Sequence, residues 1–228
     1  PESTRNMSLS MMQAPCIRRF RQATCIAVAA AFFVICAHSQ DLIFTKLTTS
    51  DGLANNSVNK IYQDSRGFIW FATWEGISRY DGYEFLNFGR SDGLANVLVN
   101  DILEDRFGRL WVAMNDGGIA LLKYTSEGSN SSNVRFTSIP VIHGSYASNK
   151  VNRLMVDSSD NIWSLTDNGV FRSPLSDEPK FQPIKLFEAT PDDIASILLF
   201  EAADKSIWFS FQNSIFSYSE GEGVKSYD

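Results

Sequence analysis

Residues 58–80 read VNKIYQDSRGFIWFATWEGISRY, and this stretch decides the fold. An apolar run rich in β-branched residues is followed by the turn sequence DSRG, by a second apolar run around a tryptophan and, after Glu-Gly, by a third run. Short apolar runs separated by Asp, Ser and Gly are typical of β-strands joined by tight turns. The stretch therefore predicts three consecutive antiparallel strands.

The same pattern occurs four times in the chain. Each copy has a tryptophan in its second run and adds a fourth run, such as YEFLNF after the first copy. The four tryptophans are Trp70, Trp111, Trp163 and Trp208, at spacings of 41, 52 and 45 residues. Four short strands in a unit of about 40 to 50 residues, without helical periodicity, are the signature of a β-propeller blade.

The repeated unit therefore predicts an all-β fold, a β-propeller of four-stranded antiparallel blades with about four blades present. A single blade cannot bury both of its faces, so we expect each tryptophan to pack between two blades. Four blades are the low end of the range for closed propellers, so we expect the complete propeller to be larger. The expected blades cover approximately residues 56–90, 96–138, 149–187 and 193–228.

A decamer is duplicated as well, since SDGLANNSVN at 50–59 returns as SDGLANVLVN at 91–100. Each copy ends where the first strand of a unit begins, and Asp-Gly and Ala-Asn supply turn residues. We therefore expect the decamer to connect the outer strand of one blade to the inner strand of the next. A catalytic loop would be expected once, so the duplication indicates a structural role.

An aspartate precedes the tryptophan by six residues in three copies, at Asp64, Asp105 and Asp157, and is absent from the fourth. Its carboxylate can accept hydrogen bonds from amides of its own turn. Alternatively, the acidic turns bind calcium, although the sequence lacks the D-x-D-x-D-G ladder with a glutamate at the twelfth position. We expect the turn interpretation to hold, and a different turn in the fourth copy.

Residues 1–39 have the composition of a secretory signal peptide. A basic stretch at 18–21 precedes an apolar run at 23–37, which ends in small residues. A membrane anchor is the alternative, but the run has 15 residues where a spanning helix needs roughly 20. All three cysteines lie in this segment, which leaves residues 40–228 without a disulfide or a thiolate metal site. We therefore expect an exported, periplasmic propeller at 40–228.

The composition argues against several classes of site. The formal net charge is −6 at pH 7, and the acidic residues are scattered. Nucleic acid is not an expected partner, because phosphate binding needs clustered Lys and Arg. Beyond residue 39 the chain has one histidine, His143, on which a zinc site or a Ser-His-Asp triad would depend. We expect no metal, no cofactor and no catalytic residue in this segment.

Two strings resemble a known family. NSVNKIYQDSRGFIWFATWEGISRYDGYEFLNF at 56–88 and LVNDILEDRFGRLWVAMNDGG at 98–118 are similar to the two-component regulator propeller repeat. The resemblance is carried by the combination of DGL before the first strand, D-x-x-G-x-I-W and GISRYDG. It covers residues 41–124 strongly and residues 149–228 more weakly.

The resemblance implies the exported sensor portion of a bacterial hybrid histidine kinase or diguanylate cyclase. Such sensors have a periplasmic ligand-sensing propeller, often of many blades, followed by an immunoglobulin-like domain, a membrane span and a cytoplasmic signalling domain. This sequence has no second apolar span and no kinase or cyclase motif, so we expect a fragment, with a short stand-alone exported propeller as the alternative. Membrane contact is expected only through the N-terminal segment or a C-terminal span outside this sequence. We expect the full-length receptor to form a homodimer.

We expect a sensing module that binds an oligosaccharide or another small ligand. Two alternatives remain open. One is a propeller glycoside hydrolase or lyase, which would need two carboxylates facing each other across the central channel. The other is a structural scaffold without a ligand. No acidic residue falls in a recognisable catalytic string, so no enzymatic activity is expected of this segment.

The candidate ligand-binding residues lie in the turns between the second and third strands, which read TWEG, MNDG, LTDNG and FQNS. In a propeller these turns share one rim with the loops that lead into each blade, where binding residues concentrate. The eight candidates are Trp74, Glu75, Asn115, Asp116, Asp167, Asn168, Gln212 and Asn213. Trp74 is expected to stack on a sugar ring and the others to bind its hydroxyls. Alternatively, the polar residues serve only the turns, and Trp74 covers a neighbouring blade.

Overall fold

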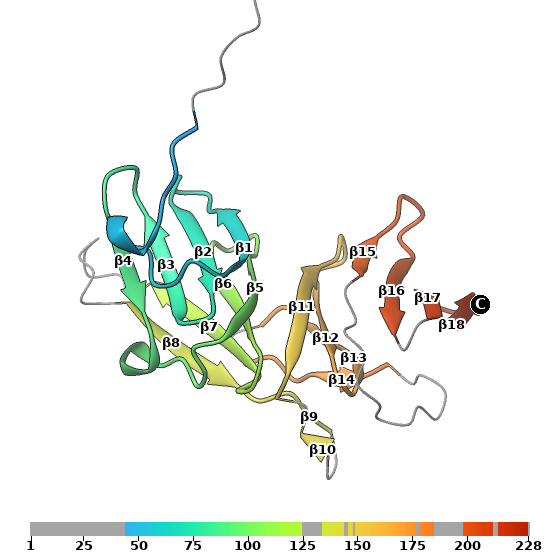
Figure 1. Ribbon diagram of the computed structural model, residues 1–228. Coiled ribbons are helices and arrows are strands. Elements are labelled where there is room, and N and C mark those ends of the chain that lie inside the picture. Colours follow the sequence, from blue (N-terminus) through green and yellow to red (C-terminus); the bar gives the residue numbers. More distant parts are fainter. Residues whose placement is uncertain are drawn as a thin grey trace, which may run out of the picture. The chain divides into compact units, whose positions relative to one another are not determined.

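The computed structural model describes residues 44–124, 134–143, 146–147, 149–176, 178–184, 198–211 and 214–227 (Figure 1). The predicted signal segment lies outside these residues. The regular structure described consists of β-strands and two short 3₁₀ turns. No helix in this described part has the length and apolar character needed to cross a bilayer.

Most of the strands form four sheets of four antiparallel strands, each sheet assembled in chain order (Figure 1). Blade 1 has β1 (Val58–Gln63), β2 (Ile69–Thr73), β3 (Gly76–Tyr80) and β4 (Phe85–Phe88). Blade 2 has β5 (Val99–Glu104), β6 (Leu110–Met114), β7 (Ile119–Tyr124) and β8 (Val134–Ile139). Blade 3 has β11 (Val151–Val156), β12 (Asn161–Thr166), β13 (Gly169–Pro174) and β14 (Gln182–Pro183). Blade 4 has β15 (Leu199–Glu201), β16 (Ile207–Phe211), β17 (Ser214–Ser219) and β18 (Gly223–Tyr227).

These sheets confirm the predicted four-stranded antiparallel blades. A further pair, β9 (Ile142–His143) and β10 (Tyr146–Ala147), lies in the chain between blades 2 and 3 and was not predicted. The four repeated tryptophans occupy the second strand of their blades, as expected. Trp70, Trp111 and Trp163 are at most 1% exposed, whereas Trp208 in blade 4 is only partly buried.

Each pair of consecutive blades has its own apolar core with a tryptophan in it. Trp70 of blade 1 packs with Ile102 and Leu110 of blade 2. The same arrangement returns at the next two interfaces, where Trp111 packs with Leu154 and Ile162, and Trp163 with Ile207 and Phe209. The predicted role of the tryptophan as the residue that packs between blades is therefore confirmed at three interfaces.

The duplicated decamer connects blades through a short 3₁₀ turn. In the second copy, η2 (Arg90–Asp92) follows β4, and the Asp92 carboxylate accepts a hydrogen bond from Gly89 N at 2.8 Å. Gly93 then takes a φ of +101°, and Leu94 is buried. The first copy has the equivalent turn η1 (Thr49–Asp51), followed by Gly52 and Leu53. The duplication thus has the structural cause that the sequence predicts.

An asparagine ties the first strand of blade 1 to that of blade 2, and another ties the first strand of blade 2 to that of blade 3. Both β1 and β5 shift register at this residue, which leaves its side chain free to reach the neighbouring blade. Asn59 Nδ2 donates to the carbonyl oxygen of Val99 at 2.7 Å, and Asn100 Nδ2 donates to that of Val151 at 2.8 Å. The Val-Asn pairs at 58–59 and 99–100 are therefore joints between blades.

A buried carboxylate reinforces this joint. Asp101, on β5, is 3% exposed, and its Oδ1 lies 3.6 Å from Lys60 Nζ of blade 1. Its Oδ2 accepts a hydrogen bond from Leu154 N of blade 3 at 3.1 Å. Burying a charge is costly unless it is paired and hydrogen-bonded, and Asp101 has a partner in each neighbouring blade. It therefore links three blades.

Candidate functional site

The aspartate before each tryptophan has two structural tasks. Asp64 Oδ1 accepts hydrogen bonds from Arg66 N at 3.0 Å and Phe68 N at 2.9 Å, which closes the β1–β2 turn. Its Oδ2 accepts from Trp70 Nε1 at 2.8 Å and so satisfies the buried indole. Asp105 and Asp157 bind Trp111 and Trp163 in the same way, at 2.8 and 2.7 Å. The turn interpretation is confirmed, and the bond to the indole is an addition that the sequence did not reveal.

Blade 4, which lacks this aspartate, satisfies its indole with a serine. Trp208 Nε1 donates to Ser206 Oγ at 2.8 Å, and the Ser206 hydroxyl donates to Asp204 Oδ1 at 2.5 Å. Hydrogen bonds from the hydroxyl and the amide of Ser206 lower the pKa of Asp204. Asp204 is therefore a carboxylate at neutral pH. The expectation of a different fourth turn is wrong, because its backbone hydrogen bonds, from Ala202 N to Ser206 O and from Lys205 N to Ala202 O, are those of the other three turns.

Asp64→Ala is expected to lower the free energy of unfolding by about 1–3 kcal/mol, because the buried indole N–H of Trp70 and two turn amides lose their acceptor. Urea denaturation measures this loss. Trp70→Phe removes the same N–H, so the double variant should cost less than the sum of the two single variants. Additive losses would contradict a coupling between carboxylate and indole.

The predicted rim residues lie in the turns between second and third strands. Trp74 and Glu75 form the β2–β3 turn, Asn115 and Asp116 lie between β6 and β7, and Asp167 and Asn168 lie between β12 and β13. Gln212 and Asn213, predicted for the β16–β17 turn, lie outside the described residues. Of the six described candidates, all except Asn115 are exposed, and Asn115 is half-buried.

The loops that lead into each blade lie beside these turns. Gly76 N donates to the carbonyl of Val97 in the loop before blade 2 at 2.7 Å. Gly117 N donates in the same way to Asn149, before blade 3, at 3.0 Å. Turns and connecting loops therefore share one edge of the sheets, which is the arrangement that the sequence predicts.

Trp74 is held at this edge with much of its ring in solvent. Trp74 is 55% exposed, and its Nε1 donates a hydrogen bond to Asn59 Oδ1 at 3.2 Å. Asn59 is itself fixed by its bond to Val99. The indole is thus anchored at one edge while a large apolar surface remains accessible beside Glu75.

A cavity of about 240 Å³ lies between blades 3 and 4, and sequence reasoning missed it. It adjoins the β11–β12 turn, at the end of β12 opposite to Asp167 and Asn168, and none of the six described rim residues lines it. Blade 3 contributes Ser159, Asn161, Trp163 and Arg172 to the wall, and blade 4 contributes residues that include Lys205, Tyr218 and Glu220.

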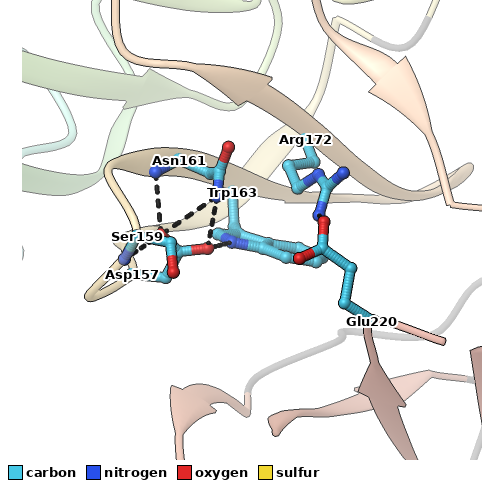
Figure 2. Close-up of polar contacts among 6 residues, drawn as sticks. All are labelled: Asp157, Ser159, Asn161, Trp163, Arg172 and Glu220. Carbon is cyan, nitrogen blue, oxygen red and sulfur yellow. Dashed lines mark hydrogen bonds and ion pairs between the residues drawn. The ribbon is translucent and has the colours of Figure 1, made fainter. Parts of the chain in front are cut away.

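Figure 2 shows the polar contacts that fix this wall. Asp157 accepts from Trp163 Nε1, as described above, and Arg172 extends over the indole. The guanidinium carbon lies 5.6 Å from the ring centre of Trp163 and 5.7 Å from that of Tyr218 in blade 4. Arg172 Nη1 lies 3.3 Å from Glu220 Oε1. Two aromatic rings therefore hold a cation at the cavity.

Two of the repeated units are similar to a known protein family. Residues 52–75 and 93–116 match the family described as two component regulator propeller. Each matched segment runs from the glycine of the decamer through the first two strands to the rim turn. The chain carries two-component regulator propeller repeats. No curated protein sequence is significantly similar to it.

Solved structures of extracellular domains from two component systems share the fold. The extracellular domains of BT3049 and BT4673 from B. thetaiotaomicron, described as hybrid two component systems, have TM-scores of 0.65 and 0.66 with sequence identities of 20% and 21%. They cover 81% and 84% of this chain, but the chain spans only 26% and 27% of theirs. Virginiamycin B lyase from Staphylococcus aureus is also similar, with a TM-score of 0.55, 17% identity, and coverage of 77% of this chain and 57% of the lyase. These likenesses establish the propeller fold.

Proposed function

We propose that the chain is part of the extracytoplasmic input propeller of a two-component type sensor, and that it binds a ligand without converting it. The observation that carries this proposal is the match of two consecutive units to the regulator propeller repeat. The likeness to extracellular domains of two-component systems supports the same role and an extracytoplasmic location.

The ligand surface that we propose is the rim around Trp74. An exposed aromatic ring fixed by a hydrogen bond can stack on the apolar face of a sugar. Glu75 lies beside it, and Asn115 and Asp116 lie in the corresponding turn of the next blade. Carboxylate and amide groups next to an aromatic ring suit a ligand with many hydroxyls, so we propose an oligosaccharide.

Incubation of the chain with a panel of plant and host oligosaccharides tests this proposal, with binding followed by calorimetry and product by chromatography. Binding without turnover is the expected result. Formation of a shortened or unsaturated product would instead favour an enzyme, which the fold of virginiamycin B lyase makes the specific alternative. Absence of both would favour a scaffold and contradict the sensor.

Trp74→Ala is expected to weaken binding of such an oligosaccharide at least roughly tenfold, because the stacking surface is lost. Its melting temperature should change little, since the ring is largely exposed. Tyr83→Ala is the matched control, because Tyr83 is 94% exposed in the β3–β4 turn, at the opposite edge of the blade. Equal affinity of the Trp74→Ala variant and the unmodified chain would show that the rim is not the recognition surface.

A further inference from the structure

The three interfaces between blades share one plan but differ in what fills them. Two residues before the tryptophan, blade 1 has Phe68, blade 2 has Arg109 and blade 3 has Asn161. Phe68 packs against the core between blades 1 and 2, and Arg109 lies over the ring of Trp111, 5.5 Å from its centre. Asn161 is shorter and bends back to Asp157, with Nδ2 2.9 Å from Oδ2. The cavity therefore lies where the other interfaces are filled.

The position four residues before the tryptophan shows the same difference. Blades 1 and 2 have the large side chains of Arg66 and Phe107 there, whereas blade 3 has Ser159. Two small polar residues thus replace two large ones in the same blade. The cavity wall in blade 3 thus has a hydroxyl and an amide, whereas the large side chains of Arg66 and Phe107 in the other two blades are exposed.

Two cations of the wall have unused donors. Arg172 has five N–H groups, and within the described residues its guanidinium forms one ion pair, with Glu220, whose side chain is 82% exposed. An ion pair with so exposed a partner is weak and readily exchanged. Lys205 takes a φ of +67° at the position where blades 1 and 2 have Gly67 and Gly108. No carboxylate of the described residues lies within ion-pair distance of its ammonium group.

The acidic residues of the wall, in contrast, have donors of their own. Asp157 accepts from the turn and the indole. Glu201 accepts from Ser158 N at 2.8 Å and from Ser158 Oγ at 2.7 Å, across the interface. Asp204 accepts from Ser206. Three of the four wall carboxylates are therefore held by donors of the protein, and the Arg172 guanidinium and the Lys205 ammonium group supply N–H donors for a ligand.

We propose that the cavity between blades 3 and 4 binds a small hydroxylated carboxylate. The ligand's carboxylate takes the place of Glu220 on Arg172, and Glu220 moves into solvent. This exchange puts one carboxylate where another was, so the charge next to the guanidinium is unchanged. Lys205 binds the same carboxylate from the blade 4 side, while Ser159 and Asn161 bind hydroxyl groups.

The volume of the cavity limits the size of the ligand. About 240 Å³ is below the roughly 300–1,000 Å³ of sites for drug-sized molecules, so a single sugar acid or a short hydroxy acid fits. Because the wall comes from both blades, a bound ligand also joins blade 3 to blade 4. This site lies at the opposite edge of the sheets from Trp74, so it stands or falls independently of the rim and of the sensor role.

The test uses the full chain with sodium glycolate, sodium L-lactate and sodium D-glucuronate at constant ionic strength. Glucose serves as the uncharged control and sodium chloride as the ionic control. Binding is measured by isothermal titration calorimetry and the melting temperature by scanning fluorimetry. We expect at least one of the three carboxylates to bind and to raise the melting temperature by a few degrees through mass action, while the two controls do neither.

Four variants assign the binding to this cavity. Arg172→Gln should weaken it at least roughly tenfold, since a charge-assisted pair is lost. Arg79→Gln is the matched control, because Arg79 faces Trp70 on β3 as Arg172 faces Trp163 on β13. Glu220→Gln should strengthen binding roughly three- to tenfold by removing the competing carboxylate. Lys205→Gly should weaken binding while keeping or raising stability, because glycine suits the positive φ.

Asn161→Phe keeps the proposal falsifiable if Arg172→Gln fails to fold. Phenylalanine occupies the equivalent position in blade 1, so this variant should fold, fill the cavity and abolish binding. The proposal is overturned if none of the three carboxylates exceeds the sodium chloride control. It is equally overturned if Asn161→Phe binds as well as the unmodified chain.

Discussion

Replacing Trp111 by alanine is expected to lower the free energy of unfolding by about 3–5 kcal/mol, the usual cost of truncating a buried aromatic side chain. Trp111 is fully buried and packs with Leu154 and Ile162 of the next blade, so its removal leaves a void between two sheets. The Asp105 carboxylate also loses the indole donor at 2.8 Å. Chemical denaturation of the variant and the unmodified chain measures the difference.

Trp74→Ala is the control for this loss. It removes the same side chain from the same chain, but from a turn in which the residue is 55% exposed. The expected cost is below about 1 kcal/mol, as for surface substitutions away from special features. Similar losses for Trp111→Ala and Trp74→Ala would mean that the repeated tryptophan is not the residue that holds the blades together.

Gly93→Ala is expected to cost about 2–5 kcal/mol, from two contributions. The φ of +101° is strained for any residue with a Cβ, by roughly 1–2 kcal/mol. A Cβ at this position would also lie 2.2 Å from the carbonyl oxygen of Phe136, so backbone must move, and overpacking typically adds about 1–3 kcal/mol. The shift in denaturation midpoint measures the sum.

Gly67→Ala separates the two contributions. Gly67 has a similar φ of +92°, but a Cβ there would have no atom within 4 Å. This variant should therefore show the backbone strain alone, roughly 1–2 kcal/mol. If Gly93→Ala cost no more than Gly67→Ala, the close approach between the decamer and β8 would not contribute to stability.

The fold could be predicted because its main determinants repeat along the chain. The tryptophan, the turn before it and the alternation of apolar runs return in each unit, so the period alone gives the four-stranded blade and the position of Trp70 on its second strand. The β9–β10 pair has no counterpart in the other units, and repetition could not reveal it. Its two-residue strands are also too short for a sequence pattern.

The indole–carboxylate bond was visible in the sequence only as a spacing. Asp64 and Trp70 lie six residues apart, and the same interval returns in the next two units. Turn chemistry explains the aspartate without the tryptophan, so nothing in the sequence required a contact. The bond arises because β1 and β2 pair in a register that brings Tyr62 opposite Trp70 and the following carboxylate to the indole edge.

The cavity between blades 3 and 4 could not be predicted for a different reason. When the units are aligned, Phe68, Arg109 and Asn161 occupy the same position, so the sequence alone shows that blade 3 has a smaller side chain there. Whether the smaller side chain leaves a cavity depends on which residues of the next blade pack against it, and only the packed structure shows these residues. The position of the rim turns could be predicted from the sequence, because a hairpin turn lies at the edge of the sheet where its two strands meet, whichever blades pack against that sheet.

The asparagine joint between first strands has a consequence for the side chains of the following blade. Asn59 and Asn100 bind main-chain carbonyl groups of the following blade, not side chains. Every residue has a main-chain carbonyl, so the joint does not depend on which unit comes next. The hydrogen bonds of Asn59 and Asn100 therefore place no requirement on the side chain that the following unit presents at the bonded position.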